Sequence, residues 1–263
     1  MISMTSLYSG SSGNCTLVEI GDAKILVDAG RPGNRIKQAI SQTDVSLEEI
    51  DAILVTHEHD DHIAGVGVLS RRYGIPVFSN ENTFLAMKSK IGKMKDENIR
   101  IFASDEAFSF KDINILPFRI SHDAAEPVGF VFDDGHDRIA TLTDTGIITQ
   151  HIRESVTGVR SILLESNHDI DMLACGSYPE PLKQRIMGEF GHLSNDTCDS
   201  FMEDLIKAGC EHFCLGHLSH ENNTPLTALN SAVRYLKNEG MSRDRDYTVL
   251  IAKRDDITDS MIL

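Results

Sequence analysis

One short segment constrains this chain more than any other, because it places three histidines and several carboxylates directly after an apolar run. Residues 52–55, Ala-Ile-Leu-Val, have the composition of a buried strand, and residues 56–62, Thr-His-Glu-His-Asp-Asp-His, follow at once. Imidazole and carboxylate groups are the protein ligands of Zn²⁺, Mn²⁺ and Fe. Alternate residues of an extended turn point to one side, so we expect His57 and His59 to share one ion and Asp61 and His62 to face a second. The alternative is a polar turn whose histidines are solvated.

Asp60 is out of phase with these ligands, and its side chain is expected to project away from them. We expect it to hydrogen-bond to the metal ligands without binding metal itself, or to be the N-cap of a helix that begins near His62.

The segment resembles the His-x-His-x-Asp-His signature of the metallo-β-lactamase superfamily. The remaining ligands of that superfamily have matches in the same order, each after apolar or β-branched residues: His122, Asp144 and His217. The resemblance implies two divalent metal ions, Mn, Zn or Fe, with Mn or Zn favoured. By this resemblance, His57, His59 and His122 hold one ion, Asp61, His62 and His217 hold the other, and Asp144 bridges them.

The fold that this resemblance implies is the αββα sandwich of the α/β (α+β) class, in which two mixed β-sheets pack face to face between outer helices. Strands are expected over residues 2–7, 15–20, 25–28 and 52–55, and helices over residues 31–42 and 63–73. Later, a hairpin through Asp134-Gly135 joins residues 128–133 to 138–143, helices cover residues 196–208 and 226–239, and strands cover residues 212–215 and 247–252. We expect residues 1–263 to form a single domain without a large insertion between Asp144 and His217.

Composition indicates an enzyme of the cytoplasm. The five cysteines are scattered and odd in number, which predicts no disulfide framework and favours a reducing compartment. The N-terminus has neither a basic segment nor an apolar run long enough for a signal peptide or membrane span, so no membrane association is expected. The formal charge of −15 argues against broad electrostatic binding of nucleic acid but leaves room for a local phosphate site, because divalent ions bring positive charge into the cleft.

Two further residues favour phosphodiester chemistry over the other reactions of this superfamily. His192, in the run Gly-His-Leu-Ser-Asn, resembles a histidine of the tRNA-processing and RNA-degrading nucleases that reaches the scissile phosphate. Glu165 matches a carboxylate that orients this histidine in the same nucleases, so the two form a predicted proton relay. The alternative is that His192 caps the following helix and that Glu165 is a surface acid at a strand end.

A small-residue loop adds a candidate substrate site. Residues 9–14, Ser-Gly-Ser-Ser-Gly-Asn, are able to present N–H groups and hydroxyls to an anion, although an ordinary glycine turn is the alternative. Together with residues 178–186 and 217–223, this loop closely resembles the WalJ/YycJ (VicX) family, which is regarded as 5′-to-3′ DNA exonucleases. The predicted substrate-binding residues are Ser11, Ser12, Gly13, Asn14, Lys183, Arg185, His192 and Asn222. For Lys183 and Arg185 a solvated helix face is an equally good interpretation.

These features predict a metal-dependent phosphodiesterase, specifically a 5′-to-3′ exodeoxyribonuclease acting on DNA with a 5′ end. Water activated between two metals would attack phosphorus, and the predicted catalytic residues are His192, Glu165 and Asp61. One alternative is a thioester hydrolase of the glyoxalase II type, which uses the same ligands but gives no role to His192 or Glu165. A second is a non-catalytic metal-binding regulatory protein. His136, His151, His168, His212 and His220 have no predicted role.

Overall fold

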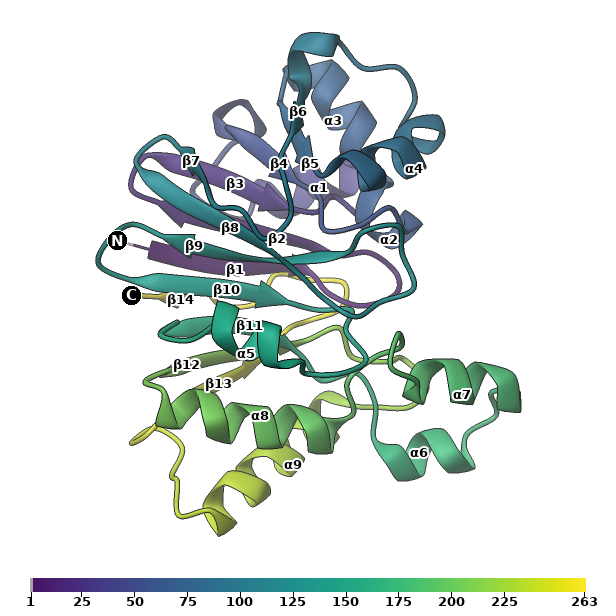
Figure 1. Cartoon of the computed structure of the whole chain (residues 1–263), viewed down its shortest axis with the longest axis vertical. Helices are drawn as coiled ribbons and strands as arrows, with labels where there is room; N and C mark the ends of the chain where they lie inside the picture. Colours follow the sequence, from purple (N-terminus) through teal and green to yellow (C-terminus); the bar gives the residue numbers. More distant parts are fainter. Residues whose placement is uncertain (1) are drawn as a thin grey trace.

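A computed structural model describes residues 2–263 and contains two seven-stranded β-sheets packed face to face (Figure 1). The first sheet has the order β14 (Met261–Ile262), β1 (Ile2–Tyr8), β2 (Cys15–Ile20), β3 (Ala23–Val27), β4 (Ala52–Leu54), β5 (Val77–Ser79) and β6 (Ile99–Ile101). The second has the order β13 (Thr248–Ile251), β12 (His212–Gly216), β11 (Ser161–Glu165), β10 (Arg138–Leu142), β9 (Val128–Asp133), β8 (Ile113–Arg119) and β7 (Phe108–Phe110).

Helices cover the outer face of each sheet, which confirms the predicted αββα sandwich (Figure 1). On the first sheet these are α1 (Gly33–Ile40), α2 (Asp60–Ile63), α3 (Val66–Tyr73) and α4 (Glu81–Ile91). On the second they are α5 (Gln150–Ser155), α8 (Asn195–Lys207) and α9 (Pro225–Asn238). Two short helices, α6 (Ile170–Cys175) and α7 (Glu180–Met187), project beyond the sandwich between β11 and α8.

Strand alternation builds three apolar layers from the two sheets. In β2, Leu17 belongs to the cluster beneath α1 and α3, whereas its neighbour Val18 belongs to the cluster between the sheets. In β10, Ile139 likewise faces the other sheet, and Ala140 faces α5 and α8. Because successive side chains of a strand point to opposite faces, strands covered on both sides must be apolar throughout.

The parallel strands of both sheets end at one edge of the sandwich. β3, β4, β5 and β6 run parallel in the first sheet, and β10, β11, β12 and β13 run parallel in the second. The segment 56–62 follows β4, Asp144 follows β10, and His217 follows β12. Residues separated by as many as 160 positions in the chain therefore meet at the carboxyl ends of their strands.

The helix expected over residues 63–73 begins later than predicted. Of this range only Ile63 lies in α2, and α3 begins at Val66. The N–H of Gly65 donates to the carbonyl of Ala29 at 2.7 Å instead of to a carbonyl of the preceding helical turn. A Cβ at Gly65 would lie 2.4 Å from the carbonyl oxygen of Arg31, so the chain passes close to the first sheet here. Gly74 ends α3 in a left-handed conformation, with φ 73°.

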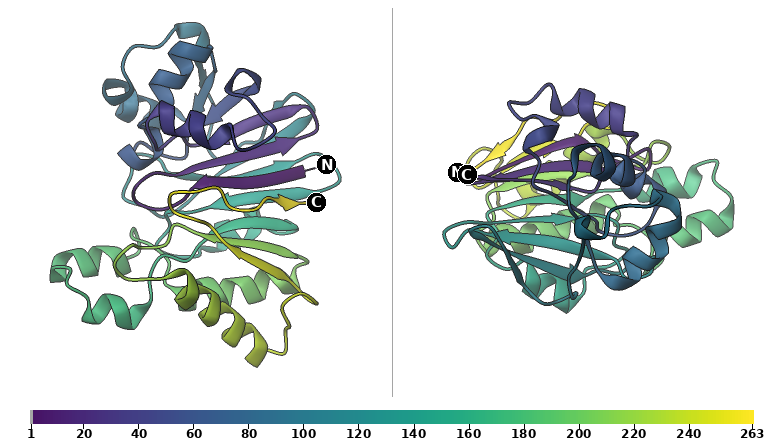
Figure 2. Two further views of the ribbon diagram at one scale, coloured as in Figure 1. Left: turned by 180° about the vertical axis from the view of Figure 1, so that it is seen from behind. Right: turned by 90° about the horizontal axis from the view of Figure 1, so that it is seen from above.

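Two smaller predictions differ from the structure. Asp60 is the first residue of α2, not its N-cap, and its exposed carboxylate pairs with Lys90 at 3.0 Å. The strand expected to close the chain is followed by β14, which pairs antiparallel with β1 (Figure 2). Two residues are too short a run to give a recognisable strand pattern.

All five cysteines are free thiols, and four of them are buried. Within residues 2–263, no helix has the length and apolar character needed to cross a bilayer.

Candidate metal centre

Three histidine rings converge at the end of β4 and form the first half of the site. The Nε2 atom of His57 lies 3.1 Å from Nδ1 of His59. The Nε2 atom of His122, on the loop after β8, lies 3.3 Å from the same Nδ1. His57 and His122 are buried, and His59 is partly exposed. Three ring nitrogens aimed at one point are the arrangement that a divalent transition-metal ion requires.

A second group adjoins the first. The Nε2 atom of His62 lies 3.5 Å from Oδ2 of Asp144 and 3.7 Å from Oδ2 of Asp61. The Nδ1 atom of His217 lies 3.0 Å from Oδ1 of Asp144. That same Oδ1 lies 3.9 Å from Nε2 of His122 in the first group. Asp144 therefore stands between the two halves, where the sequence predicts a bridging ligand.

Asp144 also shows that a cation fits here. Its side chain is buried, and its Oδ2 has no hydrogen-bond donor among the described residues. Burial would raise the pKa of this carboxyl, but the charges of His217 and His62 hold the pKa well below its ordinary value. An ionised, buried oxygen without a donor is costly unless a cation balances it. The donor set, rich in nitrogen and carboxylate oxygen, thus indicates divalent metal ions.

The backbone is strained where these ligands leave their strands. Asp28, Asp144 and His217 have φ values of 61°, 61° and 54°, in the left-handed region that residues other than glycine seldom adopt. Each such residue costs on the order of 1–3 kcal/mol, and such strain gathers at functional sites. The three residues follow β3, β10 and β12 at the same edge.

Asp28 contacts a predicted ligand, and sequence reasoning did not single it out. Its Oδ2 lies 2.7 Å from Nδ1 of His62 and accepts the hydroxyl of Thr56 at 2.8 Å. Its Oδ1 accepts the N–H of Thr56, also at 2.8 Å. Burial lowers the pKa of His62, but Asp28, Asp144 and Asp61 raise it to about 9. By engaging Nδ1, Asp28 leaves Nε2 of His62 directed at the second group. The signal available in the sequence was a carboxylate at the end of an apolar strand.

The loop after α7 supports the first group. Nδ1 of His122 lies 3.3 Å from the carbonyl oxygen of Gly191, so its Nε2 is left for the first group. A Cβ at Gly191 would lie 2.1 Å from the carbonyl oxygen of Ile186, so this close contact requires glycine. The next residue in the chain is His192, and one loop therefore orients a predicted ligand and carries the predicted proton-transfer group.

Glu165 and His192 form the pair that the sequence predicts. Glu165 is fully buried, and its Oε1 lies 2.8 Å from Nδ1 of His192. Its Oε2 accepts the N–H groups of Thr145 and Leu193 at 3.1 Å each. Burial would raise the pKa of Glu165, but His192 and His217 lower it to about 2. Glu165 is thus an ionised acceptor rather than a surface acid.

The capping alternative for His192 is also excluded. The N-cap of α8 is Ser194, whose hydroxyl accepts the N–H of Thr197 at 3.2 Å. The His192 side chain is 17% exposed, and no hydrogen bond engages its Nε2 among the described residues. The ring therefore has one nitrogen fixed by Glu165 and one nitrogen available to a substrate.

The small-residue loop turns partly inward. Oδ1 of Asn14 accepts the N–H of Gly10 at 2.8 Å, and its Nδ2 lies 3.0 Å from Nε2 of His62. The N–H of Gly13 donates to the carbonyl of Gly10 at 2.8 Å. Asn14 and the N–H of Gly13 are thus engaged within the protein. Ser11 and Ser12 are exposed, and Ser12 accepts a hydrogen bond from Arg31.

The remaining predicted substrate-binding residues have different surroundings. Nε of Arg185, in α7, donates to Asp123 at 2.6 Å, and Asp123 lies beside His122 and 4.0 Å from His59. Nζ of Lys183 donates to the carbonyl of Ala174 at 2.6 Å and is directed at α6. Asn222 is 1% exposed and its buried Oδ1 has no hydrogen-bond partner within residues 2–263, so its contact with substrate stays a prediction. It packs beneath Gly176, where a Cβ would lie 2.6 Å from its Oδ1.

Comparison with known proteins agrees with this geometry. Residues 8–174 match the metallo-beta-lactamase superfamily, and the chain belongs to that superfamily. Within it, the chain is 38% identical over 234 residues to the exodeoxyribonuclease YycJ of Bacillus anthracis, covering 89% of each protein. It is 38% identical over 254 residues to the exodeoxyribonuclease WalJ of Streptococcus pneumoniae serotype 2, covering 96% of this chain and 94% of WalJ. The chain belongs to the YycJ/WalJ family.

Solved structures show the same fold. The metallo-beta-lactamase fold protein YhfI from Bacillus subtilis aligns over 98% of this chain and 99% of its own, with a TM-score of 0.72 and 16% identity. Human tRNase Z, short form, aligns over 99% of this chain and 100% of its own, with a TM-score of 0.65 and 14% identity.

Proposed function

We propose that this protein is a metal-dependent exodeoxyribonuclease that degrades DNA from the 5′ end. Relatives that match along nearly its whole length are named exodeoxyribonucleases, and this supports a nucleic acid substrate. The observation that carries the proposal is the Glu165–His192 pair beside the metal ligands. A thioester hydrolase of the glyoxalase II type gives no role to this pair, and a regulatory metal protein needs no residue for proton transfer.

The residues that would hold the metals are those of the two groups: His57, His59 and His122 for one ion, Asp61, His62 and His217 for the other, and Asp144 for both. Two divalent ions, with Mn or Zn favoured, would lower the pKa of bound water and would place positive charge next to the phosphate. Asp28 and the carbonyl of Gly191 hold His62 and His122 in the tautomers that this role requires.

His192 is placed to handle the proton of the leaving group. Water adds to phosphorus, the bond between phosphorus and the 3′ oxygen breaks, and Nε2 of His192 donates a proton to that oxygen. Glu165 stays ionised because the pKa of its carboxyl is about 2, so it stabilises the protonated imidazole before transfer. Alternatively, His192 binds a non-bridging oxygen as charge accumulates there. Either role requires the Nδ1 atom to remain on Glu165.

Several exposed residues near the predicted metal ligands would contact the DNA strand. Ser11 and Ser12 are exposed beside Asn14, and Arg185 reaches the first metal group through Asp123. We assign the enzyme to the cytoplasm, because five free thiols suit a reducing compartment.

The test is degradation of single-stranded DNA labelled at either the 5′ or the 3′ end, with protein loaded with Mn²⁺. Progressive shortening from the 5′ end is the expected result. His59→Ala, which removes a ligand nitrogen, should abolish it, and His136→Ala, which changes an exposed histidine in a turn, should not. Absence of DNA cleavage with Mn²⁺, Zn²⁺ and Fe²⁺ would overturn the proposal.

A further inference from the structure

A second pocket lies beside the metal centre. It has a volume of about 310 Å³, and its walls come from the β1–β2 loop, the segment after His217, the start of α9 and the end of β13. Among the lining residues are Ser9, His220, Thr224, Lys253 and Arg254. None of the lining residues has been given a role in the proposed reaction.

The sheet places this pocket next to a predicted metal ligand. β12 and β13 are parallel neighbours, with Leu215 opposite Ile251, and the N–H of Ala252 donates to the carbonyl of Leu215 at 2.8 Å. Residues 253–254 therefore leave β13 beside the point where His217 leaves β12, roughly 4.8 Å away, which is the spacing between strands. Ser9 joins the two sites, because its hydroxyl accepts the N–H of His217 at 2.7 Å and also lines the pocket.

The pocket is cationic in a chain whose formal charge is −15. Lys253 and Arg254 line it and no carboxylate does. Of the acids next to lining residues in the chain, Asp255 pairs with Arg31, and Glu221 lies 2.9 Å from the ring of His220, which itself lines the pocket. Lys253 is exposed, and its ammonium has neither an ion pair nor a hydrogen bond within residues 2–263.

Two structural features add to this charge. Thr224 and Pro225 line the pocket and begin α9, a helix of 14 residues, so the positive end of its dipole faces the same space. Arg254 is held in place, because its Nη2 donates to the carbonyl of Leu218 at 2.5 Å. Its Nη1 would lie 3.0 Å from a Cβ at Gly10, so Arg254 packs closely against the small-residue loop.

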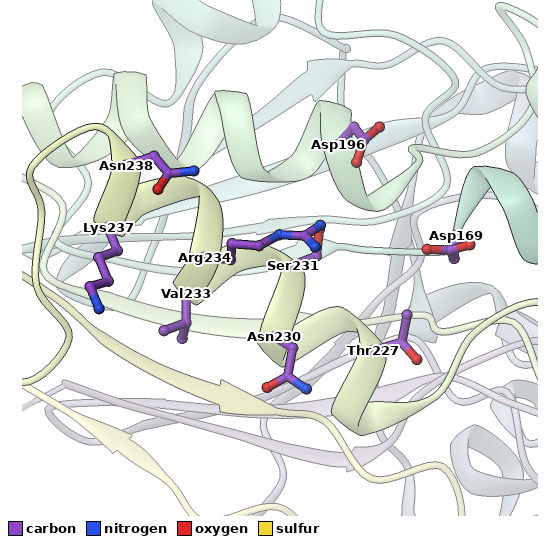
Figure 3. A pocket seen from close by; sticks show the side chains of 9 residues that line it. All are labelled: Asp169, Asp196, Thr227, Asn230, Ser231, Val233, Arg234, Lys237 and Asn238. Carbon is purple, nitrogen blue, oxygen red and sulfur yellow. The ribbon is translucent and has the colours of Figure 1, made fainter.

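A larger groove on the same half of the molecule has a different character. It lies along α8 and α9, with a volume of about 730 Å³ (Figure 3). Its cations, Arg234 and Lys237, share the groove with Asp169 and Asp196. Those carboxylates repel an anion, whereas no carboxylate lines the pocket beside His217.

We propose that the pocket lined by Lys253 and Arg254 binds the 5′-terminal phosphate of the DNA strand. This inference rests on the proposed exonuclease function. Hydrolysis of the bond to the 3′ oxygen releases a nucleotide and leaves the phosphate on the 5′ end of the remaining strand. Each cycle thus regenerates the group that the pocket recognises. The fixed distance from the pocket to the metal centre then selects the next phosphodiester and sets the polarity of degradation.

The test compares kcat/KM for single-stranded DNA carrying either a 5′ phosphate or a 5′ hydroxyl, in the wild type and three variants. We expect the wild type to prefer the 5′ phosphate and Lys253→Ala to reduce that preference about tenfold, chiefly through KM, because a hydrogen bond to a charged group is lost. Lys253→Arg should largely restore the preference. Lys237→Ala, the same change in the groove along α8 and α9, should keep the wild-type preference.

The possible failures are distinguishable. A wild-type preference that persists in Lys253→Ala would overturn the pocket assignment and leave the exonuclease standing. Equal kcat/KM of the wild type for DNA with a 5′ phosphate and DNA with a 5′ hydroxyl would also overturn the pocket assignment. If Lys253→Ala then lost activity equally on both substrates, the pocket would be assigned to an internal phosphate. Hydrolysis of bis(p-nitrophenyl) phosphate without any degradation of DNA would overturn both the proposed function and this inference.

Discussion

Asp28 and His62 are 34 residues apart in the chain, yet Oδ2 of Asp28 lies 2.7 Å from Nδ1 of His62 in the buried floor of the metal centre. Asp28 follows β3 and His62 lies in α2, which follows the adjacent parallel strand β4. This contact decides which nitrogen of His62 is directed toward Asp61 and Asp144. A carboxylate that orients a histidine in this way is an integral part of a metal site.

Asp28→Asn should weaken metal binding while the chain still folds. The amide keeps the shape but removes the negative charge that orients His62, and loss of such a partner typically costs about 10- to 100-fold in metal affinity. Competition of Mn²⁺ with a coloured chelator measures the change. The matched control is Asp112→Asn, which alters an exposed aspartate between β7 and β8. Equal affinities in the two variants would show that Asp28 has no part in metal binding.

Metal affinity should rise with pH between about 6 and 9. Asp28, Asp144 and Asp61 overcome the effect of burial and raise the pKa of His62 to about 9, so in the metal-free chain the ring holds a proton below that pH. An ion requires the neutral ring and must displace this proton, so each unit of pH lost costs up to about tenfold in affinity. Calorimetry in two buffers of different ionisation enthalpy should detect the released proton near pH 7.5. Affinity that is constant from pH 6 to 9 would contradict this assignment.

His192→Ala should lower kcat on bis(p-nitrophenyl) phosphate without emptying the metal centre. General acid catalysis contributes about 10²- to 10⁴-fold, so a loss in this range is expected. Metal content, measured by atomic emission, should match that of the wild type, because His192 is not among the predicted ligands. His136→Ala again provides the control. A variant that lost its metal would place His192 in the ligand set instead.

Glu165→Gln should change the pH profile as well as the rate. The pKa of Glu165 is about 2 and its Oε1 lies 2.8 Å from Nδ1 of His192, so replacing this ionised carboxylate by a neutral amide should alter the pH dependence of kcat/KM. A variant that only disturbed packing would lower the rate at every pH by the same factor. A parallel profile would therefore argue against a positioning role for Glu165.

Gly30→Ala should disrupt the turn that carries the ligands. A Cβ at this position would lie 1.6 Å from the carbonyl oxygen of Asp61, so either the β3–α1 loop or the segment 56–62 must move. Forced overpacking costs roughly 1–3 kcal/mol of stability, and the free energy of unfolding from urea titration should fall by that amount or more. Gly33→Ala is the control, since its nearest neighbour is a movable side-chain atom of Val68 at 3.3 Å. Equal stability of the two variants would contradict the steric argument.

Much of the metal centre was predictable because its information is local. His57, His59, Asp61 and His62 lie within six residues, so their clustering is visible in the sequence itself. His122, Asp144 and His217 each end an apolar run, and the carboxyl ends of parallel strands meet at one edge. Glu165 and His192 were recognisable from their motifs and their order in the chain.

Other features depended on which strands became neighbours. Asp28 is one of many acids that follow an apolar run, and it acquires a role only because β3 lies beside β4. Asn222 belongs to a polar motif but is buried under Gly176. Lys253 and Arg254 come near His217 only because β13 is parallel to β12. Sequence patterns specify what each strand end carries, whereas strand order and register, set by packing across both sheets, determine which strand ends meet.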